Sequence, residues 1–440
     1  MRVCGVYFVF VILLSACTNG VSHLDIALQQ AKHNKAELEK VLKHFKHDSL
    51  KYRAACFLIE NMPGKYSILP YDSLDRYKNF LKIIPQNDPI SWDVRYSKIW
   101  HGFDSISKRQ LAGFSKIEDI KVITGDYLIK NIEYAFKIWE NGKIKDYCSF
   151  DEFCHYILPY RIDHEPLSDW REEGFQKFGH LLDSLMSPRE LALRIIKLGG
   201  MRYNIGMTKY PYKQSYAEML QTRWGTCDDM AAFLALSLRA IGIPASIDYV
   251  PAWANRSSSH CWNVVKDATG DFIEVGYGPE GKNEVVYKIS KIYRKKYDIP
   301  LCDVTSEYAM PLSDLTFRVP SQKDKQLISL CTFNNYDWVP VALSKVMNGS
   351  VLFESVGRGI LWGDNQIRTY LNEGKGIVFL AFISQKGRLN NKPIGFPVIL
   401  LEDGTIKELC ASTEKESIIL YRKYPYYGCL LYTSDAADDR

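Results

Sequence analysis

The stretch RWGTCDDM at residues 223–230 places a cysteine at the start of a strongly helix-favouring segment. Thr226 is a good N-cap, and Asp229 three positions later completes a capping box. The run that follows, residues 230–238, is apolar on nearly every face, which predicts a buried helix. Cys227 therefore takes the first helical position, where the positive end of the helix dipole favours a thiolate.

The helix has a clear end, and strands are expected after it. Gly242 supplies a left-handed stop, and Pro244 blocks continuation of the helix. Residues 245–250, 259–265 and 272–277 then read as three strands, because each is rich in β-branched and aromatic residues and is bounded by turn-forming residues. A buried helix followed by a small sheet is the arrangement these features predict.

His260 lies at the start of the second of these strands. An imidazole near a thiol lowers the pKa of the thiol and can act as its general base. Because side chains alternate along a strand, we expect His260 and Trp262 on one face and Cys261 on the other. Cys261 should then point away from whatever His260 faces, which argues against a zinc site built from the two.

These motifs together resemble the core of the transglutaminase-like superfamily. The resemblance covers about residues 190–300 and implies a papain-like thiol site with a Cys-His-Asp/Glu triad. It implies that Cys227 is the nucleophile and that His260 acts first as general base and then as general acid. The short interval between them favours the transglutaminase-like arrangement, since papain keeps its histidine much further downstream. The resemblance is carried by three segments, Gly225-Thr226-Cys227, residues 238–245 and residues 259–263.

A closer similarity is to transglutaminase-like lipoproteins of gut Bacteroidetes. Residues 52–63 and 291–297 look like stretches common in that group. This similarity adds an expectation about cellular context and changes nothing in the proposed chemistry.

The third member of the triad departs from the family pattern. Many family members place an aspartate a few positions after the aromatic residue of the third strand, and no aspartate stands there in this sequence. Glu274 is the favoured substitute, with Asp271 and Glu280 as alternatives. The carboxylate fixes the histidine tautomer and stabilises the imidazolium, so a poorly placed one lowers activity. Because this aspartate is absent, a non-catalytic function is kept as an alternative.

Other residues near the motif have candidate roles. Trp224 and Trp262 are candidates for lining the substrate site or donating to an oxyanion, and core packing is the alternative for Trp224. The backbone N–H of Cys227 is the more dependable oxyanion donor, since the first helical N–H groups have no partner within the helix. Asp228 and Asp229 are interpreted as capping residues and not as cation ligands. No metal or cofactor is expected.

The N-terminal residues 1–17 read as a lipoprotein signal peptide. A short basic start is followed by an apolar run too short to span a bilayer, and then by the lipobox Leu14-Ser15-Ala16-Cys17. The resemblance implies cleavage before Cys17 and lipidation of that residue. We therefore expect a lipid anchor on the cell envelope, at the periplasmic face or the surface of the outer membrane. Residues 429–440 resemble a translated sequencing adapter, so we expect the natural protein to continue beyond Gly428.

Composition limits the remaining choices. The 440 residues predict about three domains. With 46% hydrophobic and 24% charged residues, the chain is globular. The net charge of +5 is small for this length, and the lysines are spread, so no nucleic-acid partner is expected. Its cysteines form no C-x-x-C pair, which argues against a zinc or redox motif, and the pairing of Cys148 with Cys154 is left open.

The expected fold class is α+β. Residues 18–185 form a helical N-terminal domain, and residues 186–300 form the transglutaminase-like core, with the nucleophile at a buried helix N-terminus against an antiparallel sheet. Short alternating runs between residues 315 and 428 predict a β-sandwich, truncated if the adapter interpretation is correct.

The function expected from the sequence is that of an envelope-anchored thiol enzyme. It would attack a peptide or carboxamide carbonyl through a Cys227 thioester, with hydrolysis favoured over cross-linking. The partner expected is a peptide or a peptide-linked glycan, and the oligomeric state is not specified by the sequence. Two alternatives are a catalytically decayed binding or scaffold lipoprotein, and a transpeptidase or amidase acting on cell-wall peptides.

Overall fold

The computed structural model describes residues 22–69, 115–141, 143–203, 213–255, 258–276, 287–299, 301–319, 324–334, 337–361, 367–369, 376–385 and 388–410. Cys17 with its preceding apolar run, Glu280 and residues 429–440 lie outside these ranges. In the part of the chain that the structure describes, no helix has the length and apolar character needed to cross a membrane.

The chain divides into two compact units. The first comprises Met1–Pro251, Ser259–Tyr277 and Lys291–Glu307, and the second comprises Ala252–Ser258, Gly278–Ser290 and Tyr308–Arg440. The first unit contains both the N-terminal helices and the segment with Cys227 and His260. The domain boundaries drawn from the sequence stay predictions.

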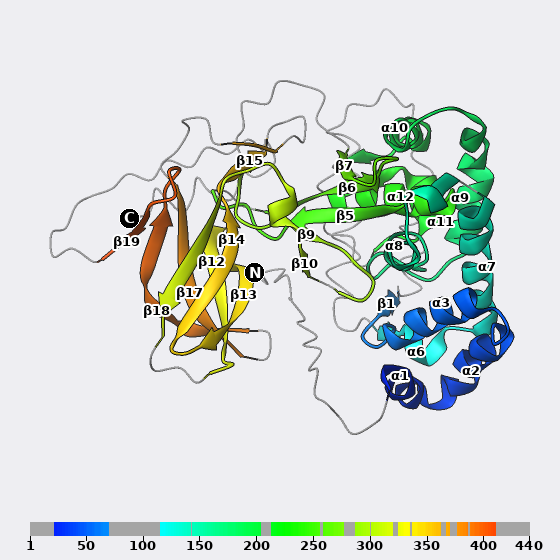
Figure 1. Cartoon of the computed structure of the whole chain (residues 1–440), viewed down its shortest axis with the longest axis horizontal. Coiled ribbons are helices and arrows are strands. Elements are labelled where there is room, and N and C mark those ends of the chain that lie inside the picture. The colour runs from blue at the N-terminus through cyan, green and yellow to red at the C-terminus, as the bar shows by residue number, and fades with distance from the viewer. Residues whose placement is uncertain are drawn as a thin grey trace, which may run out of the picture. The chain divides into compact units, whose positions relative to one another are not determined.

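The N-terminal helices of the first unit pack around one hydrophobic core (Figure 1). Ser22 forms a capping box with Asp25 at the start of the first helix, and Asp48 accepts a hydrogen bond from the Lys51 backbone N–H at the start of the third. The longest of these helices is amphipathic and buries Leu128, Ile132 and Phe136. The helices are α1 (His23–Ala31), α2 (Lys35–His44), α3 (Ser49–Glu60), α6 (Asp119–Val122), α7 (Gly125–Asn141) and α8 (Phe150–Tyr156).

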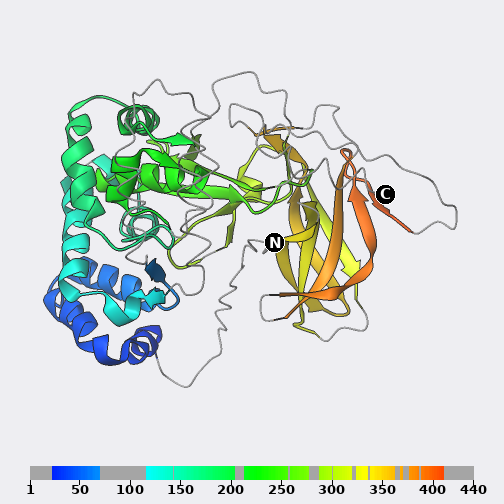
Figure 2. The ribbon, with the colours of Figure 1, turned by 180° about the vertical axis from the view of Figure 1, so that it is seen from behind.

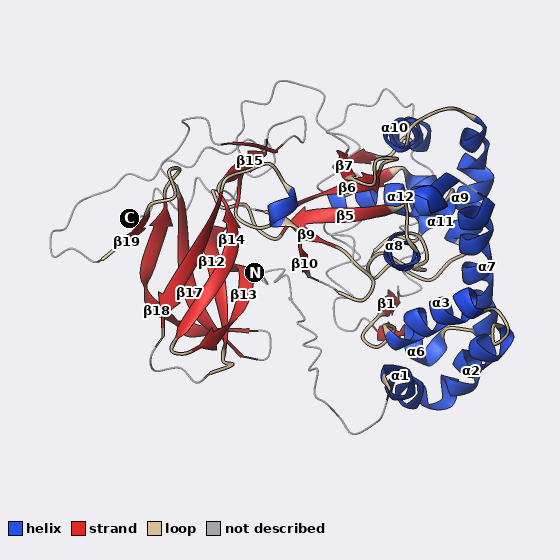
Figure 3. Cartoon of the chain, in the orientation of Figure 1, coloured by secondary structure: helices blue, strands red, loops and turns tan. Residues whose placement is uncertain are grey.

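One helix lies at the centre of the second core of this unit (Figure 3). It is α12 (Cys227–Ala240), and every residue from Asp229 to Ala240 is buried. It contacts a five-stranded sheet and also three helices, α9 (Trp170–Phe178), α10 (Pro188–Gly199) and α11 (Tyr216–Thr222). The predicted buried helix is therefore confirmed, and it is buried because neighbours cover it on more than one side.

The sheet against α12 is antiparallel throughout, in the order β10-β9-β5-β6-β7. Strands β5, β6 and β7 fall where the sequence predicts them, within one to two residues. The strands are β5 (Ala245–Val250), β6 (His260–Lys266), β7 (Phe272–Val275), β9 (Tyr293–Arg294) and β10 (Cys302–Asp303). The helix and sheet together confirm the α+β class.

Two features fix the end of α12 and the pairing of the strands beside it. Gly242 follows α12 with φ +84°, and a Cβ there would meet Ile138 Cγ2 at 2.2 Å, so glycine is required as predicted. Asp248 of β5 and Arg294 of β9 form a buried bidentate ion pair with distances of 2.8 and 2.9 Å. The pair ties β9 to β5, and Asp248 lies opposite Trp262 on β6.

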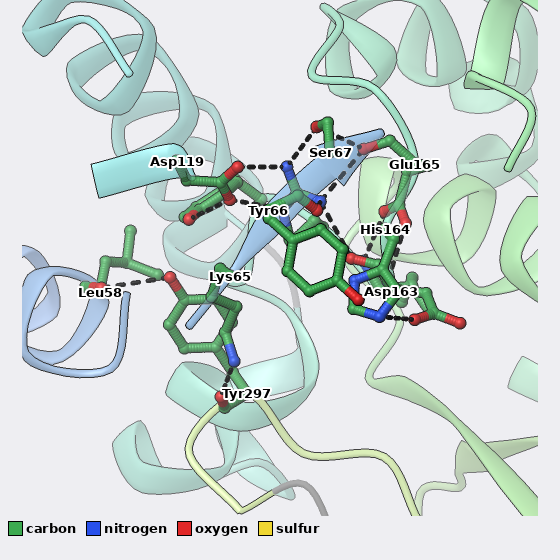
Figure 4. Close-up of polar contacts among 12 residues, drawn as sticks. Leu58, Lys65, Tyr66, Ser67, Asp119, Asp163, His164, Glu165 and Tyr297 are labelled. Carbon is green, nitrogen blue, oxygen red and sulfur yellow. Dashed lines mark hydrogen bonds and ion pairs between the residues drawn. The ribbon is translucent and has the colours of Figure 1, made fainter. Parts of the chain in front are cut away.

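A buried polar cluster orders the segment 160–165 (Figure 4). Arg161 binds Asp119 with both guanidinium branches, at 2.6 and 2.7 Å, and also donates to the carbonyl of Tyr66 on β1 (Tyr66–Leu69), which pairs with β2 (Ser115–Glu118). The Glu165 carboxylate accepts hydrogen bonds from the backbone N–H groups of Ile162 and Asp163, at 2.6 and 2.7 Å. Each buried charge is thus paired or hydrogen-bonded, as burial requires.

The second unit is built on a seven-stranded antiparallel sheet, in the order β11-β14-β13-β12-β17-β18-β19 (Figure 2). Strand β13 pairs with β12 over most of its length and with β14 at its end, so it links two halves of the sheet. Residues from both halves contribute to one hydrophobic core, and the β-sandwich expected for residues 315–428 stays a prediction. The tight turn Asn348-Gly349 between β13 and β14 has positive φ at both residues, as a two-residue hairpin requires.

The strands of the seven-stranded sheet are β11 (Leu312–Arg318), β12 (Leu327–Asn334), β13 (Asp337–Met347), β14 (Ser350–Gly357), β17 (Ile377–Gln385), β18 (Arg388–Leu400) and β19 (Ile406–Glu408). A separate three-stranded sheet has the order β16-β15-β8, formed by β8 (Tyr287–Ile289), β15 (Gly359–Leu361) and β16 (Ile367–Thr369).

Candidate active site

Cys227 is the first residue of α12, as the sequence predicts. Thr226 is the N-cap, and its hydroxyl and backbone N–H both donate to the Asp229 carboxylate at 2.9 Å. Gly225 lies so close to this capping box that a Cβ would meet Asp229 Cβ at 2.6 Å. The Gly-Thr-Cys motif is therefore a packed helix start, with glycine needed for the close approach and threonine for the cap.

The segment leading into the nucleophile is held by a buried glutamine that sequence reasoning missed. Gln214 donates through Nε2 to the carbonyl of Trp224 at 2.8 Å, and its Oε1 accepts from the Thr222 hydroxyl at 2.9 Å. Arg223 between them adopts φ +51°, a left-handed conformation that closes α11. These contacts fix the backbone of β4 (Trp224–Gly225) immediately before Cys227. An isolated glutamine in a polar stretch carries no sequence signal for this role.

His260 is the first residue of β6 and pairs with Val250, the last residue of β5. Its side chain forms a hydrogen bond with Cys227. The imidazole lies 6.1 Å from the Trp262 ring, centroid to centroid. The structure thus brings together the two residues, Cys227 and His260, that the sequence selects as nucleophile and base.

The predicted orientation of Cys261 is wrong. Its thiol packs in a small cluster with Ala231, Ala235 and Ile247, and Cys227 packs against the same cluster. His260 is the first strand residue, where the pleat no longer imposes strict alternation, so neighbouring side chains can both reach the helix end. A second thiol therefore joins the site.

The environment of Cys227 stabilises the thiolate. Hydrogen bonds from Cys261 and then His260, with the positive charge of His260 adding to them, lower the pKa of Cys227 to about 5 against the opposing effect of burial and of Asp228. The pKa of Cys261 lies well above its usual range, because it shares a hydrogen bond with the Cys227 thiolate and because it is buried. The proton of the pair therefore stays on Cys261, and Cys227 carries the charge.

Charged side chains surround this thiol pair. The Asp228 carboxylate lies 3.4 Å from the Cys261 sulfur and forms an ion pair with Lys213 at 3.3 Å. Lys295 pairs with Asp163 at 3.1 Å. Burial opposes ionisation of Asp228, yet the positive charges of Lys213 and Lys295 hold its pKa below the usual value. Asp228 is thus an anion next to the nucleophile, balanced by two lysines that the sequence does not connect with it.

The remaining carboxylate candidates lie in different places. Glu274 of β7 lies opposite Val264, four positions along β6 from His260, which is on the order of 13 Å of strand. Asp271 lies at the β6–β7 turn and accepts a hydrogen bond from the Thr269 hydroxyl at 3.1 Å. Glu280 is outside the described residues. The orienting role given to Glu274, or to either alternative, stays a prediction.

The two tryptophan candidates differ in exposure. Trp224 is half-buried and pairs with Arg202 of β3 (Arg202–Tyr203). Trp262 is only 2% exposed, so it offers almost no surface to a substrate. Their predicted roles in substrate or oxyanion binding remain untested predictions.

A metal centre does not emerge from the described residues: they contain no group of three or more His, Cys, Asp or Glu side chains arranged to hold an ion.

Comparison with known proteins defines the class of this domain. Residues 180–276 match the family model of the transglutaminase-like superfamily, so the segment that carries α12, β5, β6 and β7 is a transglutaminase-like domain. This agrees with the resemblance found in the motifs.

The chain is also similar to a solved structure. A candidate cysteine protease from Cytophaga hutchinsonii matches with 13% identity and a TM-score of 0.21, over 50% of this chain and 55% of that protein. The chain thus spans about half the length of that protein, and a TM-score this low does not establish a shared fold. A search of curated proteins found no match.

Proposed function

We propose that this protein is a thiol acyl-transfer enzyme that attacks a peptide or carboxamide carbonyl through Cys227. The observation that supports it most is the position of Cys227 at the N-terminus of α12, where His260 and Cys261 lower the pKa of its thiol. Burial of an ordinary structural cysteine raises the pKa of its thiol. The surroundings of Cys227 have the opposite effect, which is what a nucleophilic thiol requires. A transglutaminase-like domain at residues 180–276 supports the same chemistry.

In the proposed reaction the Cys227 sulfur attacks the carbonyl carbon and forms a tetrahedral oxyanion. The backbone N–H groups of the first turn of α12, which have no partner within the helix, would stabilise this oxyanion. His260 takes the Cys227 proton as general base and then gives it as general acid to the leaving amine, and a thioester with Cys227 remains. His260 then removes a proton from water, which attacks the thioester and releases the acid and the free thiolate.

Hydrolysis is proposed over cross-linking because water needs no dedicated binding site, whereas an acceptor amine does. The proposed substrate is a peptide or a peptide-linked glycan of the cell envelope, and the proposed anchor is a lipid on Cys17. Both follow from the sequence expectations, and they are separate from the chemistry at Cys227.

The experiment that tests the chemistry is a substrate panel with the purified chain, Cys227→Ala and His260→Ala. The panel contains peptides, side-chain carboxamides and cell-wall stem peptides, each with and without an added primary amine. We expect hydrolysis that Cys227→Ala abolishes and His260→Ala reduces by at least about a hundredfold. Hydrolysis that survives in Cys227→Ala would refute the assignment, and incorporation of the amine would replace hydrolysis with transfer.

The anchor has an independent test. Metabolic labelling with a fatty-acid analogue should label the wild-type protein and leave Cys17→Ser unlabelled. Labelling that persists in Cys17→Ser would contradict the proposed lipidation site, whatever the enzyme assays show.

A further inference from the structure

We propose that Cys261 acts as a resolving thiol, which forms a reversible disulfide with Cys227 when a peroxide oxidises the nucleophile. This would make the pair a redox switch and protect Cys227 from irreversible damage. The proposal rests on the proposed function for its biological meaning, since closing the switch would block the nucleophile. The disulfide chemistry itself is read out without any substrate.

The contact between the two thiols carries the inference. Cys227 packs against the small apolar cluster that contains Cys261, Ala231 and Ile247. The Cys261 thiol also donates a hydrogen bond, at 3.4 Å, to the carboxylate of Asp228, the neighbour of Cys227 in the first turn of α12. The two thiols therefore lie beside each other where β6 packs on the start of α12, and the lowered pKa of Cys227 agrees with this closeness.

The backbone on both sides of this contact is fixed. Asn263, two residues after Cys261, donates to the carbonyl of Ala231 in α12 at 2.8 Å, which ties β6 to the helix. The capping box holds Cys227 from the other side. A disulfide requires the Cα atoms to be about 4.4–6.8 Å apart, so the proposal requires these tied elements to hold Cys227 and Cys261 within that range.

Cys227 is the thiol on which oxidation should begin. Burial raises the pKa of Cys148 and of Cys154 to about 12, and it raises that of Cys331 further. Among the cysteines in the described ranges, Cys227 has the lowered pKa, and it is only partly buried. Susceptibility to peroxide follows thiolate character and exposure, so Cys227 should react before these other thiols.

The chemistry is balanced with a peroxide as the oxidant. The Cys227 thiolate attacks a peroxide oxygen, which breaks the O–O bond, gives a sulfenic acid and releases an alkoxide or hydroxide that takes up a proton. The Cys261 sulfur then attacks the sulfenic sulfur, and the Cys227–OH oxygen leaves as water with the Cys261 proton. Two electrons pass from the thiol pair to the peroxide in total. A dithiol reductant reduces the Cys227–Cys261 disulfide back to two thiols by thiol–disulfide exchange.

The test uses the full chain, hydrogen peroxide and peptide mass spectrometry. Trypsin places each thiol on its own peptide, residues 224–239 for Cys227 and residues 257–266 for Cys261. In wild-type protein, peroxide should produce these two peptides joined by a disulfide, two hydrogen atoms lighter than their sum. Dithiothreitol should then return Cys227 to its starting level of alkylation. Oxidation of Cys227 to sulfinic acid in the wild type, with no joined peptide, would overturn the proposal.

Two variants at Cys261 test the resolving role, and one variant at Cys302 is the matched control. In Cys261→Ser, which keeps a hydrogen-bond donor, and in Cys261→Ala, peroxide should convert Cys227 to forms that dithiothreitol does not recover, so the alkylatable fraction is lost. Cys302→Ala, at a partly exposed cysteine of β10, should behave like the wild type. Full recovery of Cys227 in both Cys261 variants would also overturn the proposal.

The outcome separates this inference from the proposed function. Hydrolysis by untreated protein without a joined peptide after peroxide would refute only the resolving role of Cys261. A joined peptide in a protein that hydrolyses no member of the substrate panel would refute the enzymatic function and support the disulfide.

Discussion

Replacing Cys261 with alanine should raise the pKa of Cys227 by a predictable amount. The hydrogen bond from the Cys261 thiol is the largest influence that lowers the Cys227 pKa to about 5. Hydrogen bonds to charged groups are worth about 1.5–3 kcal/mol, and one pKa unit corresponds to about 1.4 kcal/mol. We therefore expect the Cys227 midpoint to rise by about one to two units in Cys261→Ala, because the thiolate loses one donor and keeps His260.

The assay is the rate of iodoacetamide alkylation at Cys227 between pH 3 and pH 10, measured on the tryptic peptide 224–239. The rate falls as the pH falls through the midpoint, because the thiol and not the thiolate then predominates. Cys261→Ser should retain a donor and shift the midpoint less than alanine does. An alkylation midpoint that is the same in wild type and Cys261→Ala would refute the reasoning, since the two thiols would then not share a hydrogen bond.

Three stability predictions follow from close contacts in the first unit, each measured by urea unfolding. Gly225→Ala should lower the unfolding free energy by about 1–3 kcal/mol, because its Cβ would meet Asp229 Cβ at 2.6 Å, and an unchanged midpoint would contradict the packed helix start. Asp248→Asn should lower it by about 3–5 kcal/mol, because the buried Arg294 loses the buried half of its ion pairing and keeps only the half-exposed Glu307; a loss below about 1 kcal/mol would refute the role given to this pair. Glu39→Gln, in an exposed pair within α2, serves as the matched control and should change the free energy by less than about 1 kcal/mol.

The helix that carries the nucleophile could be predicted because its signals are local. The capping residues Thr226 and Asp229 are three positions apart, and Gly242 stands where the chain must turn, so each acts on its own neighbours in sequence. The strands that follow could be placed for the same reason, since residue type and turn residues bound them. The nucleophile and His260 also rest on a resemblance that the family match at residues 180–276 bears out at the level of the superfamily.

The parts of the site that were missed depend on contacts between distant segments. Alternation along β6 predicts that Cys261 faces away from Cys227, and it fails because His260 is the strand's first residue, where the pleat constrains side chains least. Lys213 and Lys295 come from segments on either side of the core and are brought near Asp228 only by the tertiary fold. No periodicity or spacing in the sequence links these residues.

The measurement that tests the central claim most directly is the pH dependence of Cys227 alkylation in wild type and in His260→Ala. The structure predicts a wild-type midpoint near pH 5, with the rate falling below it, and a higher midpoint in His260→Ala because the thiolate loses both a hydrogen bond and a neighbouring positive charge. A wild-type midpoint near the free-thiol value of about 8.5, indifferent to His260, would contradict the thiolate–imidazolium pair. That result would leave the transglutaminase-like domain as an inactive core.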